Sequence, residues 1–287
     1  MIATAEPQLS LLSPAGEIAA EPAAAPQGPQ DHVRVLTANV QHASPARTHQ
    51  QAVWLATQHE HDMLVLTEVA AGESGDVMAR LLGEFDYRVH LPAPGEDPYR
   101  VLVAVRGGSL EAVEDVGVTV MSHRCVAARA KLPQGEIGVV GLYVPSRGPK
   151  EQRNVAKRAF QEAVAAALLD LRRRMSVAGP VVLTGDLNVV EPNHEPRYAV
   201  FGQWEYDFYR AFAEAGFADA FRLITPEGMD YSWYGRAAAD GTRNGYRFDH
   251  TFITADHAHT VRACHYVHAI RDQGLTDHSA MALVIGV

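Results

Sequence analysis

The chain has 287 residues, of which 47% are hydrophobic and 21% charged, and its formal net charge is -9. These proportions are those of a globular protein, and they exclude a collagen, a wholly disordered chain and a bundle of membrane spans. The negative charge argues against a protein that coats nucleic acid through a broad basic surface, but it leaves room for an enzyme that holds a few phosphates in a local patch.

The N-terminal segment differs in composition from the rest of the chain. Residues 1–30 are rich in Ala, Pro and Gln, so we expect a disordered tail, followed by one domain at 31–287. A secretory signal begins with a positive region, and no Lys or Arg precedes Arg34, so we expect a cytoplasmic protein. We also expect a monomer without a membrane span. Cys125 and Cys264 are interpreted as reduced buried thiols, with a single disulfide as the alternative.

Short β-branched runs and stretches with helical spacing follow one another from residue 33 onwards. In chain order, the pattern predicts a strand at 33–40, a helix at 46–60, a strand at 62–69, a helix at 74–83, strands at 86–91, 99–106, 116–121, 124–132 and 136–145, a helix at 150–175, a strand at 179–190, a helix at 204–216, and strands at 229–234, 246–254, 260–268 and 279–286. Because it mixes βαβ units with meanders, this order predicts an α/β protein with two mixed sheets packed face to face and helices outside.

Polar residues recur where the predicted apolar strands end or are interrupted. They are Asn39, Glu68, Tyr143, Asp186, Asn188, Asp249, His250, Asp277 and His278. Each one alone has the simpler interpretation of a turn or cap residue, but together they are well placed to line a cleft at one edge of the sheets. Asp186 and Asn188 are two positions apart, so on extended backbone they face the same side.

Seven short strings occur in the order seen in the endonuclease/exonuclease/phosphatase superfamily. They are TANV, LTEV, LYVPS, LTGDLN, YSWYG, GYRFDH and LTDHSA. The chain most resembles the exonuclease III and abasic-site endonuclease branch, which places Tyr and Pro where Tyr143 and Pro145 stand, whereas related phosphatases usually place a His near this point. The resemblance implies a four-layer α/β/β/α sandwich, a site at one edge of its sheets, and phosphoester hydrolysis dependent on Mg²⁺ or Mn²⁺.

The resemblance also implies individual roles around the metal and the phosphate. Glu68 matches the metal-binding glutamate, and Asn39 and Asp277 match positions beside the metal. Mg²⁺ prefers oxygen ligands and keeps several waters, so one or two carboxylates suffice. Asp186 matches the residue that activates the attacking water or handles a leaving-group proton, and Asn188 matches the asparagine that binds the phosphate.

Further matches concern a buried pair and the substrate side. Asp249 and His278 match a pair in which the carboxylate fixes the imidazole's tautomer and raises its pKa, so that His278 would bind a phosphate oxygen as a cation. The phenol of Tyr143 would donate to the phosphate. Trp233 matches an aromatic residue beside the lesion or the terminal nucleotide, with plain core packing as the alternative. Arg247 is expected to bind substrate.

Other basic residues leave two interpretations open. Arg222 is expected to be structural. Basic residues follow Tyr143 into the long helix, where they would contact a nucleic-acid backbone or form a solvated helix face. They are Arg147, Lys150, Arg153 and Lys157. Of these, Arg147 is the predicted substrate-binding residue.

Two departures from the branch bear on the substrate. The branch usually carries Gly and Arg after the residue matching Asn39, and Thr and Lys after the one matching Glu68, whereas residues 41–44 are QHAS and residues 69–72 are VAAG. DNA is the expected partner, for incision at abasic sites or trimming of 3′ ends. The lost basic residues favour the alternative of a phosphatase or phosphodiesterase on a small molecule or lipid. A non-catalytic binding protein is the third reading, and retention of the catalytic residue types argues against it.

Overall fold

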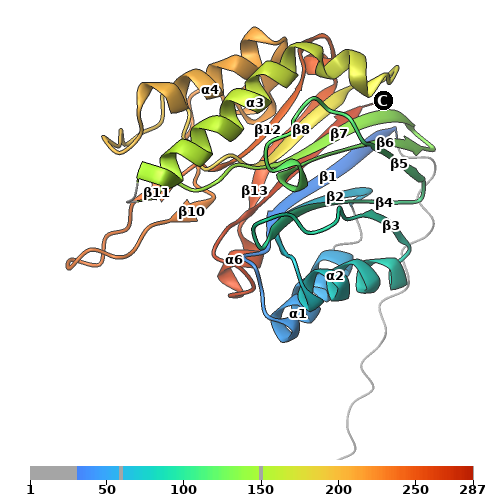
Figure 1. Cartoon of the computed structure of the whole chain (residues 1–287), viewed down its shortest axis with the longest axis horizontal. Helices are drawn as coiled ribbons and strands as arrows, with labels where there is room; N and C mark the ends of the chain where they lie inside the picture. The colour runs from blue at the N-terminus through green and yellow to red at the C-terminus, as the bar shows by residue number, and fades with distance from the viewer. Residues whose placement is uncertain (1–30, 58–60, 149–150, 287) are drawn as a thin grey trace, which may run out of the picture.

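The computed structural model describes residues 31–57, 61–148 and 151–286, so the predicted tail at 1–30 lies outside the described residues. Two six-stranded sheets lie face to face in the middle of the molecule (Figure 1). The first sheet has the order β13 (Val261–Val267), β14 (Ala280–Gly286), β1 (His32–Asn39), β2 (Met63–Ala70), β4 (Tyr99–Arg106) and β3 (Tyr87–His90). The second has the order β5 (Ser109–Val113), β6 (Cys125–Leu132), β7 (Gly135–Tyr143), β8 (Val181–Asp186), β12 (Asp249–Thr254) and β9 (Phe217–Asp219). A short ribbon pairs β10 (Trp233–Tyr234) with β11 (Gly245–Tyr246).

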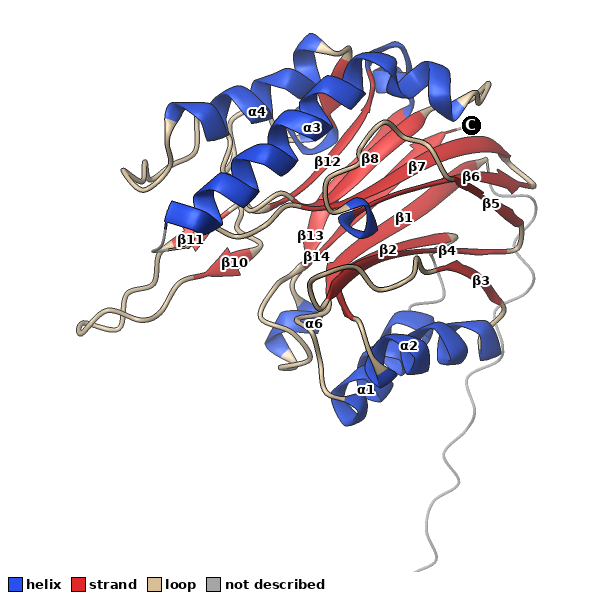
Figure 2. Ribbon diagram, in the orientation of Figure 1, coloured by secondary structure: helices blue, strands red, loops and turns tan. Residues whose placement is uncertain are grey.

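Helices cover the outer faces of both sheets (Figure 2). α1 (Pro45–Thr57) and α2 (Glu73–Glu84) pack on the first sheet, and α3 (Glu151–Met175) and α4 (Gln203–Glu214) on the second. The shorter helices are η1 (Ser122–Arg124), α5 (Ala220–Ile224), η2 (Ala255–Thr260) and α6 (Ala269–Asp272). None of the helices in the described ranges is both long and apolar enough to cross a bilayer.

Side-chain alternation along the strands divides the core into three layers. Val35 of β1 faces the layer between the sheets, whereas its neighbour Leu36 packs under α1 and α2, because successive strand residues point to opposite faces. Apolar residues of α3 and α4 fill the third layer. Both cysteines are buried and unpaired, as expected. The predicted four-layer α/β/β/α sandwich is confirmed.

One predicted strand is wrong. The segment 116–121 is not a strand, and the edge strand of the second sheet is instead β5, which pairs with β6. Gly117 and Met121 have positive φ values of 83° and 47°, which break an extended run. Val116 and Val118 are nevertheless buried in the layer under α3, so their apolar character reflects packing from a loop. The predicted strand at 246–254 is also interrupted, and forms β11 and β12.

Strand register brings the predicted polar residues to one edge of the sandwich. β7 and β8 are parallel and β12 is antiparallel to β8, so Tyr143 pairs with Asp186 and Asp186 pairs with Asp249. In the facing sheet, the parallel strands β1 and β2 place Asn39 and Glu68 at the same edge. Glu68 has a positive φ of 55°, within a register irregularity of the β2–β4 pairing.

Candidate active site

A cavity of about 360 Å³ opens at this edge of the sheets. Its lining includes Glu68, Arg147, Asp186, Asn188, Phe201, Trp233, Tyr246, Phe248, Asp277 and His278. The structure therefore brings most of the predicted site residues to one cavity. Asn39, Tyr143 and Asp249 lie against it through hydrogen bonds to its lining carboxylates and imidazole.

Glu68 is oriented by two donors on a single oxygen. Asn39 Nδ2 donates to Glu68 Oε1 at 3.0 Å, and the Tyr143 hydroxyl donates to the same oxygen at 2.7 Å. Burial and the nearby Glu68 charge hold the pKa of Tyr143 well above its usual range, so the phenol stays protonated. Within the described chain no hydrogen bond reaches Glu68 Oε2, so this oxygen is left for a ligand.

The amide of Asn39 is turned away from a role as metal ligand. Its nitrogen also donates to Asp186 Oδ2 at 3.0 Å, while its oxygen accepts the Gln41 N–H at 2.8 Å. An amide nitrogen cannot coordinate a cation, so the expected place of Asn39 among the metal residues is corrected. Asn39 holds Glu68 and Asp186 together instead.

Asp186 and Asn188 form a compact unit after β8. Asn188 has a positive φ of 49°, which lets its N–H donate to Asp186 Oδ1 at 2.8 Å. Its amide nitrogen donates to the Val144 carbonyl at 2.9 Å. Burial, reinforced by the nearby charge of Asp249, raises the pKa of Asp186 above the usual range of a carboxyl group. A carboxyl group tuned in this way is suited to taking or giving a proton near neutral pH.

His278 and Asp249 form the predicted pair. His278 Nδ1 lies 2.8 Å from Asp249 Oδ2. Burial alone would lower the pKa of His278, but the charge and hydrogen bond of Asp249 outweigh it and raise the pKa to about 10. Because Nδ1 is occupied, Nε2 remains as the donor of an imidazolium that lines the cavity.

Aromatic residues form one wall of the cavity. The Trp233 ring stacks on Phe248 at a centroid distance of 5.7 Å and lies 5.4 Å from the ring of Tyr246. Its Nε1 donates to Asp277 Oδ2 at 2.9 Å, which fixes both side chains at the cavity. Trp233 is half-buried there, so it has one side available to substrate rather than being part of the core.

Of the basic residues after Tyr143, Lys157 has different surroundings from those expected. Arg147 lines the cavity and donates to Glu205 Oε2 at 2.6 Å. Lys157 is 0% exposed, which excludes both the solvated face and the contact with nucleic acid. Its Nζ donates to Glu205 Oε1 at 2.6 Å and to the Asn188 carbonyl at 2.8 Å, so it fixes the loop that carries Asn188. Lys150 and the side chain of Arg153 lie outside the described residues.

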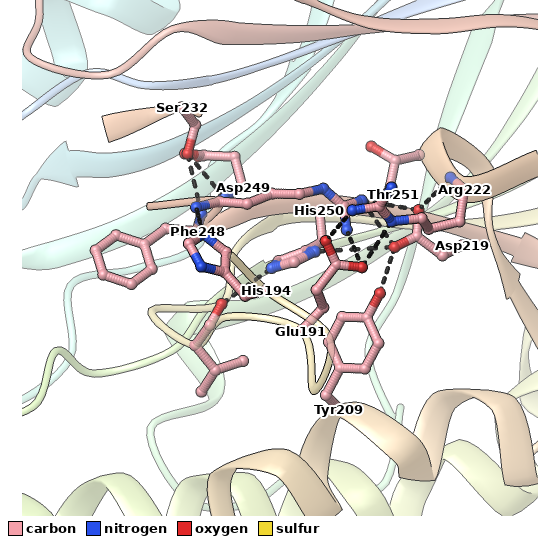
Figure 3. Close-up of polar contacts among 12 residues, drawn as sticks. Glu191, His194, Tyr209, Asp219, Arg222, Ser232, Phe248, Asp249, His250 and Thr251 are labelled. Atoms are coloured by element: carbon pink, nitrogen blue, oxygen red, sulfur yellow. Dashed lines mark hydrogen bonds and ion pairs between the residues drawn. The ribbon is translucent and has the colours of Figure 1, made fainter. Parts of the chain in front are cut away.

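A buried ionic network lies beneath β12 (Figure 3). Arg247 is 0% exposed, donates through Nη2 to both oxygens of Asp219 at 2.8 and 2.7 Å, and pairs with Glu191 at 3.2 Å. It cannot reach substrate, so its expected role in substrate binding is corrected. Arg222 pairs with Glu191 and binds neighbouring carbonyl groups, in line with the structural role expected for it. Nothing in the sequence pattern indicated that Glu191 and Asp219 are the partners.

His250 belongs to this network rather than to the cavity. It is fully buried, and its Nε2 lies 3.0 Å from the Val189 carbonyl. Burial, together with the nearby guanidinium of Arg247, lowers the pKa of His250 to about 4. The imidazole is therefore neutral at neutral pH.

We expect His250 to make the fold sensitive to acid. Its pKa is depressed on folding, so between about pH 6.5 and pH 4 the unfolded chain binds more protons and the free energy of unfolding falls as the pH falls. Relative to His250→Gln, the wild type should lose about 3 kcal/mol over this window. Urea unfolding at several pH values measures how the free energy of unfolding changes with pH in the wild type and in His250→Gln. The matched control is His265→Gln, a change at an exposed histidine. Equal slopes for wild type and His250→Gln would contradict the assignment.

Comparison with known proteins extends the match beyond the seven strings. The model of the Endonuclease/Exonuclease/phosphatase family matches residues 36–278. A curated relative, the exodeoxyribonuclease of Bacillus subtilis, is 30% identical over 148 residues, which are 48% of this chain and 57% of that protein. The alignment with it thus spans just over half of the relative's length.

Solved structures share the fold. An AP endonuclease from Archaeoglobus fulgidus superposes with a TM-score of 0.70 at 22% identity, covering 89% of this chain and 100% of that one. The AP endonuclease LMAP from Leishmania major superposes with a TM-score of 0.72 at 18% identity, covering 89% and 88%. The family match spans most of the chain and agrees with the ordered motifs. The chain therefore belongs to the endonuclease/exonuclease/phosphatase family.

Proposed function

We propose that this chain is a divalent-metal-dependent DNA nuclease of exonuclease III type, which incises abasic sites or trims 3′ ends. The observation that carries the proposal is the convergence of Glu68, Asp186, Asn188 and His278 on one cavity with an aromatic wall. Likeness to an exodeoxyribonuclease and to AP endonucleases supports the choice of DNA.

The ligand groups of the cavity suit Mg²⁺ or Mn²⁺. The described residues hold no cluster of three or more His, Cys, Asp or Glu side chains that would form a closed metal cage. Mg²⁺ needs no such cage, because it keeps several waters and takes one or two carboxylates. Glu68, with its free Oε2, would hold the ion, and Asp277 lines the same cavity. When bound, such an ion neutralises phosphate charge and polarises the phosphoryl group.

The protein's own groups account for binding and proton transfer. The imidazolium of His278 would bind a non-bridging oxygen of the scissile phosphate, where negative charge gathers in the transition state. The amide of Asn188 would bind a second one by exchanging its donation to Asp186 Oδ2 for the phosphate. Asp186 would accept a proton from the attacking water or hand one to the leaving oxygen. Tyr143 and Asn39 keep Glu68 oriented throughout.

A small-molecule or lipid phosphoester hydrolase is the second candidate. It is favoured by the absence of the expected basic residues at 41–44 and 69–72. A basic group lies next to the first of these segments, because Arg47 Nη1 donates to Gln41 Oε1 at 3.0 Å.

Cleavage of a labelled duplex with one abasic site separates the two candidates. We expect incision with Mg²⁺ or Mn²⁺ and none with EDTA. Metal-dependent hydrolysis of bis(4-nitrophenyl) phosphate without incision or end trimming of DNA would transfer the proposal to the second candidate. Loss of neither activity with EDTA would contradict the metal requirement.

Glu68→Gln should raise the metal concentration needed for half-maximal activity by at least about tenfold, since even residues that only support a metal ligand change affinity by this much. The measurement is activity against Mg²⁺ concentration. Glu84→Gln, on the exposed face of α2, is the matched control. An unchanged metal dependence in Glu68→Gln would remove Glu68 from the metal site.

A further inference from the structure

A second cavity, of about 720 Å³, is lined in part by Tyr143. Tyr143 and Ser146 belong to its wall, and Ser146 also lines the catalytic cavity, so the two cavities are neighbours. The segment before β6 contributes Val120 and Met121 as apolar residues and Arg124 as a basic one. The segment leading into β4 contributes the carboxyl groups of Glu96 and Asp97.

Arg124 is built into this cavity in an unusual way. The residue is 5% exposed, and its guanidinium lies over the rings of Tyr99 and Tyr143, at 4.9 and 4.5 Å from their centroids. Only its Nε has a hydrogen bond, to Asp97 Oδ2 at 2.8 Å. Nη1 is buried without a partner, and Nη2 has none in the part of the chain described.

A buried donor without a partner is costly, and the cost is removed when an acceptor is bound. The two free nitrogens of Arg124 form the planar fork that binds phosphate oxygens in pairs. Asp97 binds only one edge of the guanidinium, at Nε, and its Oδ2 also lies 3.2 Å from His123 Nε2, so the Nη1 and Nη2 edge of Arg124 is left for another acceptor. Arg124 thus offers two donors to an anion beside the apolar residues Val120 and Met121, in a cavity whose wall also carries Glu96 and Asp97.

We propose that this cavity is a second substrate subsite, which binds the phosphodiester next to the scissile one through Arg124 and accommodates its nucleoside against Val120 and Met121. The inference rests on the proposed nuclease function, because a polynucleotide carries a further phosphate on either side of the scissile one. In this proposal, contact with the DNA backbone next to the scissile phosphate comes from η1. Residues 41–44 and 69–72, where the expected basic residues are missing, do not provide it.

The test uses abasic duplexes in which single phosphates flanking the scissile bond are replaced, one at a time, by neutral methylphosphonates. In the wild type, one such replacement should lower kcat/KM by about tenfold or more. In Arg124→Met the same replacement should have no further effect. In the control Arg129→Met, on the strand β6 that follows η1, it should act as in the wild type. Hydrolysis of bis(4-nitrophenyl) phosphate, which has no flanking phosphate, should change less than twofold in Arg124→Met.

Each outcome decides one of the two proposals. If the wild type cleaves DNA but no flanking methylphosphonate matters, or if it matters equally in Arg124→Met, the subsite is overturned and the nuclease function stands. Equal losses on DNA and on bis(4-nitrophenyl) phosphate would show that Arg124 only supports Tyr143. If the wild type cleaves no DNA, the proposed function fails and the subsite with it. The wild-type series needs no variant, so a misfolded Arg124→Met protein leaves the proposal testable.

Discussion

Asp186→Asn should lower turnover of the abasic duplex by roughly 10²–10⁴-fold, the range for removal of a group that transfers a proton in the transition state. The amide has nearly the same shape as the carboxylate, but it can neither accept nor deliver that proton. The same loss is expected on bis(4-nitrophenyl) phosphate, because Asp186 acts at the reacting phosphate in both substrates.

The fold should survive this change because two effects on stability oppose each other. The pKa of Asp186 is raised on folding, so its charge costs stability at every pH above the unfolded pKa, and a neutral side chain removes this cost. Against this, Asp186 accepts through both of its oxygens, at Oδ2 from the side-chain amides of Asn39 and Asn188 and at Oδ1 from the Asn188 N–H, whereas an amide in its place has only one oxygen. Thermal unfolding measures the balance.

Asp207→Asn makes the same chemical change on the exposed face of α4 and is the matched control. It should leave both rate and unfolding temperature unchanged. If the Asp186→Asn enzyme kept more than about a tenth of the wild-type rate, Asp186 would not be the proton-transfer group.

The polar residues gathered at the catalytic cavity were predictable, because they belong to the matched strings and stand at the ends or starts of strands. Asp186, Asp249 and His278 stand in short ordered strings, and each string lies at the end or start of a buried strand. Such strings do not show which way the oxygen and nitrogen of a side-chain amide point. Asn39 was expected beside the metal, but the hydrogen bond from Gln41 to its oxygen turns its nitrogen towards Glu68.

The buried charges were not predictable, because a charged residue in a sequence is ordinarily exposed. Lys157 has the spacing of a solvated helix residue and becomes buried only because α3 packs against α4, which supplies Glu205. Arg247 sits in a matched string, yet its partners Glu191 and Asp219 come from a loop and a three-residue strand far away in the chain. Contacts of this kind depend on tertiary packing, which leaves no local pattern.

Arg247→Met should lower the free energy of unfolding by about 3–5 kcal/mol, the cost of breaking a buried ion pair by removing one partner. Methionine fills much of the volume but leaves the carboxylates of Glu191 and Asp219 without their buried cation. Urea unfolding at neutral pH measures the loss. Arg210→Met, which removes an exposed arginine paired on α4, is the matched control and should change stability by less than about 1 kcal/mol.

The pH dependence distinguishes this mechanism from simple loss of packing. Ion pairing lowers the pKa of both Glu191 and Asp219 against the opposing effect of burial, so in the wild type their contribution to stability is present above the unfolded pKa values and is lost as the pH falls through the folded ones. In Arg247→Met, less positive charge counteracts the effect of burial on the pKa values of Glu191 and Asp219. Both carboxyl groups should therefore protonate at higher pH, which removes the unpaired negative charge. The difference in the free energy of unfolding between wild type and Arg247→Met should therefore become smaller from pH 7 towards pH 4. Adding Glu191→Gln to Arg247→Met should recover part of the lost stability at pH 7. A gap that is constant with pH, with no recovery in the double variant, would mean that Arg247 stabilises the strand by packing and not by charge.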